Sequence, residues 1–378
     1  MSAKKHILTF VYWFFRTFCP IKRTKILFES YYGSMYGCNP KYLSEYIIQN
    51  SPTLEVVWAF SNKHPEVKGA KKVRHNSVRY YYELATAHFF VTNYRTTLVF
   101  HKRKGQIYIQ TWHSSLRLKK IEKDTEETLS KEYIAMAQAD SRQIDFLISG
   151  CRDSTKIFKR AFWYRGPILE VGTPRNDFLL QTPDKDKIAQ IKRRLGIKED
   201  NMVVMYAPTF RKNHSLECYD LDYENLVKEL KGKFSAEGLS VVLRLHPHLI
   251  GYSSQLTASN PALVDATSYP DIQELLYIAD VLITDYSSLM FDFLFTKKPC
   301  FIFEKDLKEY TQNDRGLYYS VTQLPFSVST TNEDLCRQIS EHDNKAAINR
   351  YNDFLSKIGS FEDGHACQRI LNVITERI

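Results

Sequence analysis

The chain has 378 residues, of which 43% are hydrophobic and 25% are charged. This composition is that of a folded protein with about two domains of ordinary size, and it excludes an intrinsically disordered chain. The formal net charge of +9 indicates an acidic partner, and three classes meet that description: a nucleic acid, an anionic membrane surface or a phosphorylated substrate.

The first residues combine positive charge with an apolar run. Lys4 and Lys5 precede residues 7–15, which are apolar except for Thr9, and Arg16 follows. The run is too short to span a bilayer, and no small-residue cleavage site of a signal peptide comes after it. Two interpretations stay open, a helix in the interface of an anionic membrane and a first helix packed on the domain. On the first, residues 1–23 form a membrane-associating segment.

Strand and helix patterns alternate through the first half of the chain. Asn39 is the expected cap of a helix that begins near Pro40, because proline suits the first helical position. Strand-like runs cover residues 25–30, 54–60, 88–93 and 105–113, and a further helix is expected near residues 77–87. This alternation predicts a parallel sheet with helices on both faces.

Two segments interleave basic and aromatic residues. Residues 94–105 include Arg95 and three later cations, and they predict either a patch that faces membrane or phosphate, or a solvated loop. Residues 156–166 hold two lysines, two arginines, two phenylalanines, a tryptophan and a tyrosine. That mixture suits lipid headgroups or a pyrophosphate better than a dry core.

A charged, polar stretch at residues 181–201, with a helix that ends at Leu195 and Gly196, is expected to join two domains. Beyond it, strands are expected at 203–210, 240–246, 281–284 and 299–304, with helices near 224–234 and 272–279. The predicted domains are therefore residues 24–185 and 186–378, both α/β. Two such domains place a ligand cleft between them, at the carboxyl ends of the strands.

The segment ADVLITDYSSLMFD (residues 279–292) reads as a strand, a tight turn and the start of a buried helix. Free backbone N–H groups and the positive end of a helix dipole make such a turn suitable for an anion. The alternative is an ordinary helix capped by Asp285 or a serine.

Polar or basic residues directly follow five predicted strands. They are His113 in QTWHSSLRLKKI, Arg175 and Asn176 in VGTPRND, Thr209 and Arg211 in YAPTFRKN, His246 and His248 in LRLHPHL, and Asp285, Ser287 and Ser288 in TDYSS. Imidazoles suit proton transfer, and guanidinium groups suit phosphate oxygens. The simpler reading is that each histidine is a satisfied buried side chain, and that Arg175 pairs locally with Asp177.

Several common site motifs are missing. The sequence has no phosphate-binding Gly-rich loop of the ATPase or dinucleotide type, which argues against an ATPase and an NAD enzyme. It has no DxD, HExxH or clustered carboxylates to suggest a catalytic metal, so neither a metal nor a cofactor is predicted. Seven scattered cysteines without a close pair favour reduced thiols over disulfides or a zinc site.

In order and wording, NPKYLSEYI, QTWH, LKKI, GTPRND, YAPTFR, LHPH and ADVLITDYSSLMFDFLFTKKPCFIF resemble the CDP-glycerol glycerophosphotransferase family of teichoic acid synthesis. The resemblance runs from about Phe28 to about Gly316. It implies a GT-B-like fold with two Rossmann-like domains facing a central cleft. Residues 24–185 would be the acceptor-side domain and residues 186–378 the CDP-alditol-binding domain.

The resemblance also implies roles for individual residues. His113 matches the family's tryptophan-histidine motif and is expected to act as base toward the acceptor hydroxyl, while His246 is expected on the reacting phosphate. Arg211, with the serine pair Ser287 and Ser288, would bind the pyrophosphate. The remaining expected substrate contacts are Thr209, His248, Asp285, Arg175 and Asn176. One departure concerns residues 114–116, Ser-Ser-Leu where the family commonly has Gly-Thr-Pro, which leaves the acceptor open.

What the resemblance implies is transfer of glycerol phosphate from CDP-glycerol to a lipid-linked teichoic acid precursor, with release of CMP. The acceptor would be an undecaprenyl-diphosphate-linked saccharide, and the enzyme would sit peripherally on the cytoplasmic face of the cell membrane. Alternatives are a CDP-ribitol-dependent transferase and a GT-B glycosyltransferase that uses a nucleotide sugar. A non-enzymatic nucleic-acid or anionic-surface binder fits less well, because no nucleic-acid module is recognisable; no nucleic acid is expected as partner.

Overall fold

Two parallel α/β units make up the computed structural model, which describes residues 3–61, 66–97, 100–211, 216, 219–307, 310 and 316–378. Unit 1 comprises Met1–Ser115, Ile121–Phe178 and Ser360–Ile378, and unit 2 comprises Leu116–Lys120 and Leu179–Gly359. Cys218 and the side chains of Lys4 and Lys5 lie outside the described residues.

Unit 1 is built on a seven-stranded sheet in which every pair of neighbours is parallel, as the alternation of elements predicts. Its strand order is β3-β2-β1-β4-β5-β6-β7, so the order reverses between β1 and β4. The strands are β1 (Lys22–Glu29), β2 (Glu55–Phe60), β3 (Lys71–Arg74), β4 (Ala87–Thr92), β5 (Ile107–Gln110), β6 (Phe146–Ser149) and β7 (Ile168–Glu170). All six residues of β4 are buried, because helices cover both faces of such a sheet.

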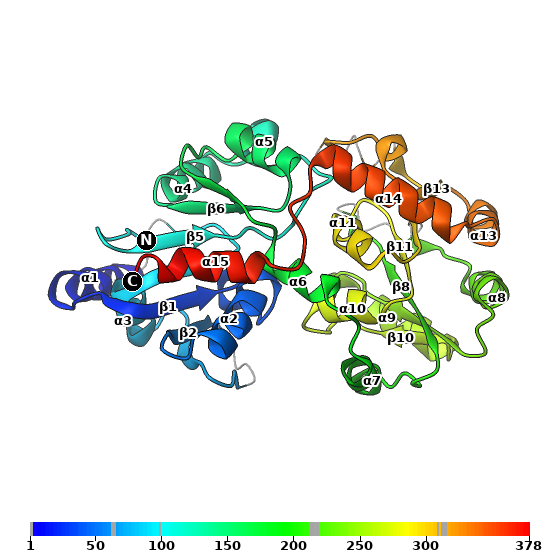
Figure 1. Ribbon diagram of the computed structural model, residues 1–378, viewed down its shortest axis with the longest axis horizontal. Helices are drawn as coiled ribbons and strands as arrows, with labels where there is room; N and C mark the ends of the chain where they lie inside the picture. The colour runs from blue at the N-terminus through cyan, green and yellow to red at the C-terminus, as the bar shows by residue number, and fades with distance from the viewer. Residues whose placement is uncertain are drawn as a thin grey trace. The chain divides into compact units, whose positions relative to one another are not determined.

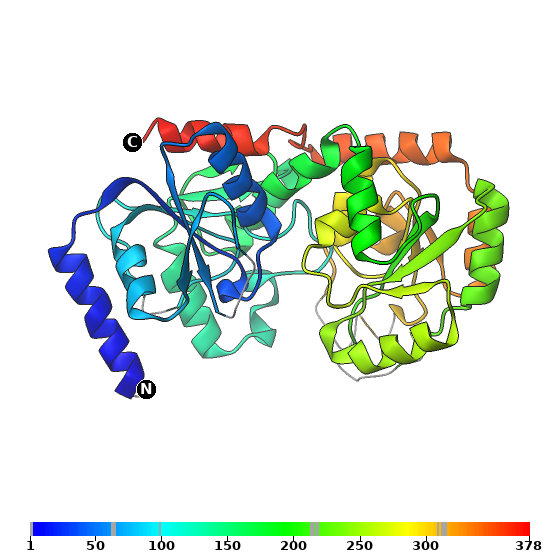
Figure 2. The same ribbon diagram turned by 90° about the horizontal axis from the view of Figure 1, so that it is seen from below.

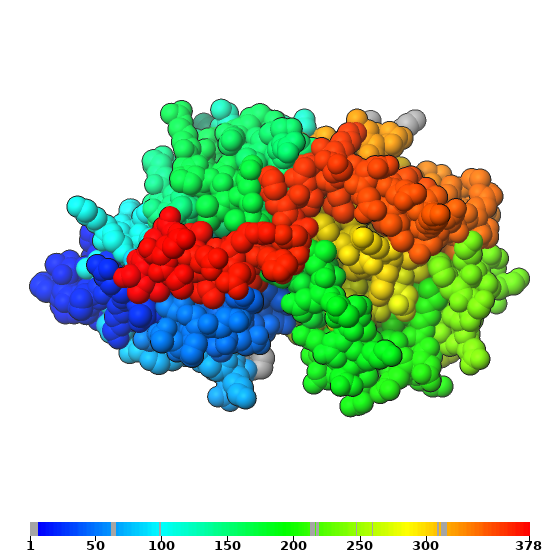
Figure 3. Space-filling model, in the orientation of Figure 1, coloured from blue at the N-terminus to red at the C-terminus, as the bar shows by residue number. Residues whose placement is uncertain are grey.

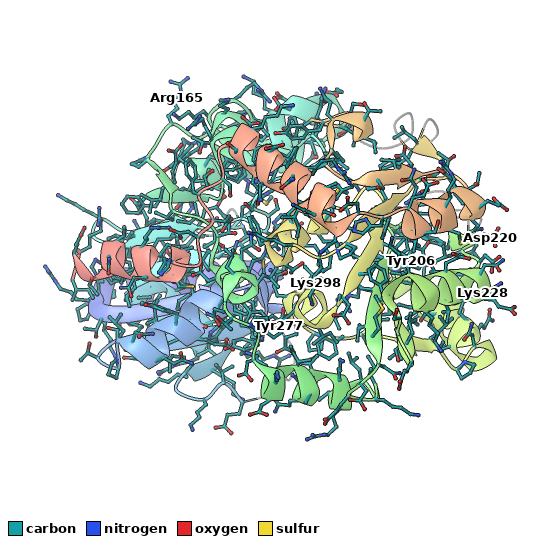
Figure 4. The ribbon with its side chains drawn as sticks, turned by 45° about the vertical axis from the view of Figure 1, so that its right-hand side comes forward. Arg165, Tyr206, Asp220, Lys228, Tyr277 and Lys298 are labelled. Atoms are coloured by element: carbon teal, nitrogen blue, oxygen red, sulfur yellow. The ribbon has the colours of Figure 1, made fainter. Side chains whose placement is uncertain are left out.

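The helices of unit 1 come from both ends of the chain (Figure 1). They are α1 (Ala3–Phe18), α2 (Cys38–Asn50), α3 (Val78–Thr86), α4 (Lys131–Ser141), α5 (Arg152–Ala161), α6 (Pro174–Leu180) and α15 (Ala366–Thr375), and short 3-10 turns form η1 (Tyr31–Gly33) and η2 (Glu122–Thr128). In α5 the lysines and arginines are exposed, whereas Phe158 is buried. Phe162, the first residue after the helix, is buried as well. The expectation that residues 156–166 avoid a dry core is therefore wrong for these rings. Near the end of the segment, Arg165 is exposed and points outward (Figure 4).

The predicted cap of α2 is also wrong. Gly37 occupies the N-cap position, and the side chain of Asn39 is fully buried. Its Nδ2 donates to the carbonyls of Thr111 (3.2 Å) and Trp112 (3.1 Å), and its Oδ1 accepts from the backbone N–H of Arg175 (3.1 Å). Asn39 thus ties loops together, because distant backbone groups compete successfully for its amide.

α1 packs along α3 (Figure 2), as the interpretation of a first helix packed on the domain predicts. On its inner face Tyr12 is fully buried and donates to the His101 carbonyl (2.7 Å), and the ring of Phe15 lies edge-on to Tyr82. Its outer face exposes large apolar side chains: Ile7, Phe10, Trp13, Phe14 and Phe18. Among the described residues, no helix has the length and apolarity to cross a bilayer.

The end of the chain belongs to unit 1, where α15 packs against α2 (Figure 3). Asp177 caps α15, since its carboxylate accepts from the backbone N–H groups of Ala366 (2.9 Å) and Cys367 (2.7 Å). Glu362 accepts from the N–H (2.9 Å) and hydroxyl (2.7 Å) of Thr173. The predicted ranges 24–185 and 186–378 differ from these units at both of their ends, because buried contacts rather than chain order define a compact unit.

Unit 2 has a six-stranded, all-parallel sheet of order β10-β9-β8-β11-β12-β13. This is the order of a dinucleotide-binding α/β fold, with its reversal between β8 and β11. The strands are β8 (Met202–Ala207), β9 (Leu239–Leu243), β10 (Leu263–Asp265), β11 (Val281–Thr284), β12 (Cys300–Phe303) and β13 (Ser327–Ser329).

The helices of unit 2 include the predicted ones near residues 224–234 and 272–279. They are α7 (Lys185–Arg194), α8 (Tyr223–Phe234), α9 (Ile250–Ser259), α10 (Ile272–Ile278), α11 (Leu289–Phe293), α13 (Asn332–Ser340) and α14 (Asn344–Ile358), with 3-10 turns η4 (Pro247–Leu249), η5 (Leu294–Thr296) and η6 (Val321–Gln323). Lys298 closes the end of α10 by donating to the Ala279 carbonyl (2.6 Å), and it lies beside Tyr277 (Figure 4).

Candidate active site

Unit 2 contains a cavity of about 600 Å³ at the carboxyl ends of its central strands. The lining comes from residues 207–210 after β8, 244–246 after β9 and 286–289 after β11, together with Lys119 and Ile272. Because β8 and β11 flank the point where the strand order reverses, the cavity occupies the usual ligand position of such a sheet. Of the predicted residues, Thr209, His246, Ser287 and Ser288 line it.

His246 is exposed to the cavity, and its ring lies 4.6 Å from that of Phe210 and 4.9 Å from that of His248. Partial burial, and then the neighbouring His248, lower the pKa of His246. The backbone N–H of His248 donates to its Nδ1 (3.4 Å), so the neutral ring carries its proton on Nε2. His246 is thus prepared to donate a hydrogen bond to an anionic oxygen.

Arg211 and Asp285 form a buried pair below the cavity wall. Asp285 accepts from the N–H of Thr209 (2.7 Å) and from Nη2 of Arg211 (2.8 Å). The guanidinium also reaches Asp306, through Nε (2.6 Å) and Nη2 (2.9 Å). These bonds fix the loop after β8, so the structure describes Arg211 bound by two carboxylates, and its contact with a pyrophosphate stays a prediction.

The hydroxyl oxygens of Ser287 and Ser288 both accept hydrogen bonds from backbone N–H groups. The Oγ of Ser288 accepts from the N–H of Leu118 (3.1 Å), and that of Ser287 accepts from Leu289 (3.4 Å). The helix predicted after them is a single short turn, α11, followed by η5. An anion site at this helix start stays a prediction, and the contribution of the helix dipole is small because few peptide units are aligned.

Residues 116–120 belong to unit 2, which the sequence pattern does not predict. The segment pairs with residues 316–318: the N–H of Lys120 donates to Gly316 (2.8 Å) and that of Tyr318 to Leu118 (2.7 Å). This places Lys119 in the cavity wall, 5.0 Å from the Tyr310 ring centre. In the sequence, the lysine pair of LRLKKI is the signal for this position. The residues that pair with this segment lie about two hundred positions later in the chain.

In unit 1, His113 follows β5 and is half-buried. Its Nδ1 lies 3.2 Å from the backbone carbonyl of Asn93, and its ring stacks on Trp112 at 4.3 Å. A carbonyl can only accept, so Nδ1 carries the proton and Nε2 of the neutral ring keeps its lone pair. That tautomer is the one that a general base needs.

Trp112 is supported from behind by a buried ion-pair network. Its ring meets Phe162 edge-on at 4.8 Å, and the guanidinium of Arg95 lies 3.6 Å from the centre of the Phe162 ring. Arg95 is itself buried between Glu122 (2.7 Å) and Asp140 (3.0 Å). The prediction that residues 94–105 present a surface patch or solvated loop is thus wrong for Arg95, which shapes the site from inside.

The structure places Arg175 and Asn176 in the interior of unit 1. Asn176 donates to Thr173 (2.9 Å) and Glu362 (3.2 Å). Nη1 of Arg175 lies 3.5 Å from the sulfur of Cys38. The carboxylate of Asp177 caps α15, and a substrate contact for Arg175 or Asn176 stays a prediction.

Across the described ranges, no group of three or more His, Cys, Asp or Glu side chains is arranged to hold a metal ion. None of the six described cysteines forms a disulfide.

The family model for CDP-glycerol:poly(glycerophosphate) glycerophosphotransferases matches residues 11–376. The chain belongs to this family. This match confirms the predicted resemblance over nearly the whole length of the chain.

Several proteins that are similar to this chain in sequence are named as teichoic acid polymerases or transferases. A teichoic acid poly(glycerol phosphate) polymerase of Staphylococcus epidermidis is 34% identical over 376 residues, which cover 95% of this chain and 51% of that protein. The Bacillus subtilis polymerase is 33% identical and is covered to 49%, against 94% of this chain. The chain thus spans about half the length of these two relatives. A Staphylococcus aureus teichoic acid glycerol-phosphate transferase is 32% identical, with 99% and 98% covered.

The solved structure of the wall teichoic acid polymerase TagF superposes with a TM-score of 0.85 at 32% identity, covering 98% of this chain and 93% of that one. This match confirms the predicted GT-B-like class of two parallel α/β domains. A more distant neighbour, a UDP-N-acetylglucosamine 2-epimerase from Listeria monocytogenes (TM-score 0.53, 14% identity, 94% and 96% covered), shares the fold alone.

Proposed function

We propose that this protein transfers glycerol phosphate from CDP-glycerol to a lipid-linked teichoic acid precursor and releases CMP. The observation that carries the proposal is the family match over residues 11–376, which includes both the cavity of unit 2 and His113 of unit 1. The undecaprenyl-diphosphate-linked saccharide acceptor is part of the same proposal.

The cavity of unit 2 supports a role as the donor site. Its volume of about 600 Å³ lies within the usual range for small-molecule sites. Lys119 adds positive charge to the wall, and the Nε2–H of His246 offers a donor to a phosphate oxygen. In this proposal the serines and Thr209 contact the pyrophosphate, whereas Arg211 and Asp285 hold the loop that presents Thr209.

The transfer step needs a base and a stabilised leaving group. Nε2 of His113 takes the proton of the acceptor hydroxyl, whose oxygen attacks the β-phosphorus of CDP-glycerol. The bond from that phosphorus to the bridging oxygen breaks, and CMP leaves with the bonding electrons. Positioning and electrostatics supply most of the rate in such transfers. Only two residues separate His113 from the segment Leu116–Lys120, which is built into unit 2.

We place the protein peripherally on the cytoplasmic face of the cell membrane, with an anionic bilayer as the partner of α1. Five large apolar side chains on its outer face are between 44% and 72% exposed. Arg16 and the first residues of β1 add positive charge next to them. An exposed apolar stripe beside cations is the pattern of a helix that lies in a membrane interface.

Mass spectrometry of the reaction products tests the proposed function. The protein is incubated with a lipid-linked disaccharide and, separately, CDP-glycerol, CDP-ribitol or UDP-sugars. We expect addition of glycerol phosphate with release of CMP. Addition of ribitol phosphate would support the closely related alternative, and release of UDP with sugar transfer would establish a glycosyltransferase. Tight RNA binding in moderate salt without any transfer would support the non-enzymatic alternative.

A further inference from the structure

Two tyrosines flank His113 in unit 1 and a third packs against one of them, and the proposed function gives none of the three a role. The ring centres of Tyr31 and Tyr94 lie 5.8 and 6.1 Å from that of His113. Tyr94 also lies 5.9 Å from Tyr31 and 4.7 Å from Tyr32. All three tyrosines are partly exposed. We call Tyr31, Tyr32 and Tyr94 the tyrosine platform.

The platform occupies the ligand position of its sheet. Tyr31 and Tyr32 follow β1, Tyr94 follows β4 and His113 follows β5, so all of them leave the carboxyl ends of neighbouring strands. The strand order of unit 1 reverses between β1 and β4. Ligands of open α/β sheets bind at such a reversal, and this one belongs to the sheet of unit 1.

The turn that presents two of the rings is strained. Tyr31 and Tyr32 have φ of 46° and 56°, in the left-handed region, which costs a side-chain-bearing residue about 1–2 kcal/mol. Gly33 completes the turn with φ of 76°, and a Cβ there would lie 2.9 Å from the backbone nitrogen of Ser61. Strain of this kind concentrates at functional sites, where the surrounding structure maintains it.

The side chain of Asn93 holds the strained turn in place through Oδ1, and its Nδ2 is a further hydrogen-bond donor. Its Oδ1 accepts from the N–H of Tyr31 (3.0 Å), which fixes the orientation of the amide, and its carbonyl faces His113. Its Nδ2 is fully buried and has no hydrogen-bond partner within the described part of the chain. Leaving a buried donor unpaired costs about 1–3 kcal/mol, so a water or ligand hydroxyl would complete the site.

The carboxylates that act on Tyr32 favour a neutral ligand over a phosphate at that ring, whereas the guanidinium of Arg175 acts on Tyr31. The carboxylates of Asp140 and Glu29 both act on Tyr32, and after burial and Tyr94 they raise its pKa, so its hydroxyl stays protonated. Arg95, the cation that opposes them there, is already paired with Glu122 and Asp140. Neutral phenols beside carboxylates suit hydroxyl groups, and the ring faces suit the C–H surfaces of a sugar or polyol.

We propose that the tyrosine platform binds the hydroxyl-bearing end of the acceptor, as a neutral sugar ring or glycerol unit, next to His113. The proposal rests on the proposed function and adds the place where the attacking hydroxyl is held. The platform binds that end unit as an uncharged polyol, whatever phosphates lie further along the acceptor.

Steady-state kinetics of the full chain test the platform with Tyr94→Leu, which removes the ring, and Tyr94→Phe, which keeps it. With a saccharide acceptor and separately with a glycerol-phosphate oligomer, we expect Tyr94→Leu to raise the acceptor KM at least tenfold and Tyr94→Phe to raise it less. The KM for CDP-glycerol should stay within twofold. If Tyr94→Leu raises the KM for only one of the two acceptors, that acceptor shows whether the platform binds a sugar ring or a glycerol unit. Tyr46→Leu, on a partly exposed tyrosine of α2, is the matched control and should change neither constant.

Two results would overturn the platform: an unchanged acceptor KM in Tyr94→Leu, or equal rises in the KM for acceptor and donor. Thermal melting of both variants separates misfolding from lost binding, and Tyr94→Phe keeps the test valid where Tyr94→Leu is unstable. Failure of the proposed function looks different, because the unmodified protein would then form no glycerol-phosphate product with either acceptor.

Discussion

One backbone carbonyl and one aromatic ring orient the side chain of His113 for its expected role. The Asn93 carbonyl selects the tautomer, and Trp112 holds the ring from one side. The base is therefore aligned before any acceptor arrives, which is how a positioned side chain gains its rate advantage.

Replacing His113 by alanine should lower the rate of transfer by about 10²–10⁴-fold, the usual contribution of general acid–base catalysis. Binding of CDP-glycerol should persist, because the cavity of unit 2 does not include His113. Calorimetry with CDP-glycerol and product mass spectrometry measure the two properties. His365→Ala, at an exposed histidine of the same unit, is the control, and normal turnover by His113→Ala would remove the base assignment.

Glu304 gives the stability a pH dependence. Burial, followed by the charges of Asp285 and Asp306, raises its pKa from 4.5 to about 7, and its Oε2 has no hydrogen-bond partner among described atoms. The folded state thus keeps a proton that the unfolded chain releases, so this group makes stability fall as pH rises through that window. Glu304→Gln should gain ~1 kcal/mol at pH 8, allowing for solvent screening, and nothing at pH 4.

Denaturant unfolding of Glu304→Gln at both pH values measures the effect. Glu362→Gln is the matched comparison, because burial raises the pKa of Glu362 to about 7 as well. Its oxygens accept from Thr173 and Asn176, so an amide would set an NH₂ group against a donor and destabilise unit 1. A loss of stability in Glu304→Gln at pH 8 would show that the carboxylate has a native partner.

At the scale of elements, α1 has one buried face and one exposed apolar face. Tyr12 faces inward and Phe10 faces outward, 72% exposed. A helix that only packed on the unit would place polar residues on the outer face, because exposed apolar area of this kind is normally avoided.

The double variant Phe10→Ser, Phe14→Ser should bind anionic vesicles several-fold less tightly, since each buried methylene contributes about 0.8 kcal/mol. Sedimentation with phosphatidylglycerol vesicles at low and high salt measures partitioning. Ile250→Ser, at an exposed isoleucine of α9, is the control and should bind normally. Unchanged sedimentation of the double variant would mean that α1 has a structural role only.

At the scale of the whole molecule, each compact unit contains segments that are distant in the sequence. Unit 1 takes its last helix from residues 360–378, and unit 2 takes residues 116–120 from the first half. The polar residues of GTPRND contribute to this arrangement, because Asp177 caps α15 and Asn176 bonds Glu362.

Asp177→Ala should destabilise unit 1 by about 1–3 kcal/mol, because two backbone N–H groups lose a buried acceptor. Hydrogen exchange followed by mass spectrometry should show faster exchange in α15 and α2, with unit 2 protected as before. Asp343→Ala removes one cap bond, to Ala346, from the helix α14 of unit 2. It should affect that helix alone, and equal losses in both units would contradict the division.

The sequence by itself determined the elements, their alternation and the family. Apolar runs of β length between amphipathic helices require parallel sheets, and motifs adjacent to the strands, such as LHPH and TDYSS, located His246 and the serines at a cavity wall. Those signals are local, because they depend on the periodicity and on the turn residues.

Only the tertiary structure decided which polar groups each residue meets. Arg211 is bound by the carboxylates of Asp285 and Asp306, Asn39 bonds loops instead of capping a helix, and Tyr31 and Tyr94 meet beside His113. These partners are brought together by strand order and by segments distant in the chain. A buried side chain takes the hydrogen bonds that its surroundings offer, and sequence spacing does not record those surroundings.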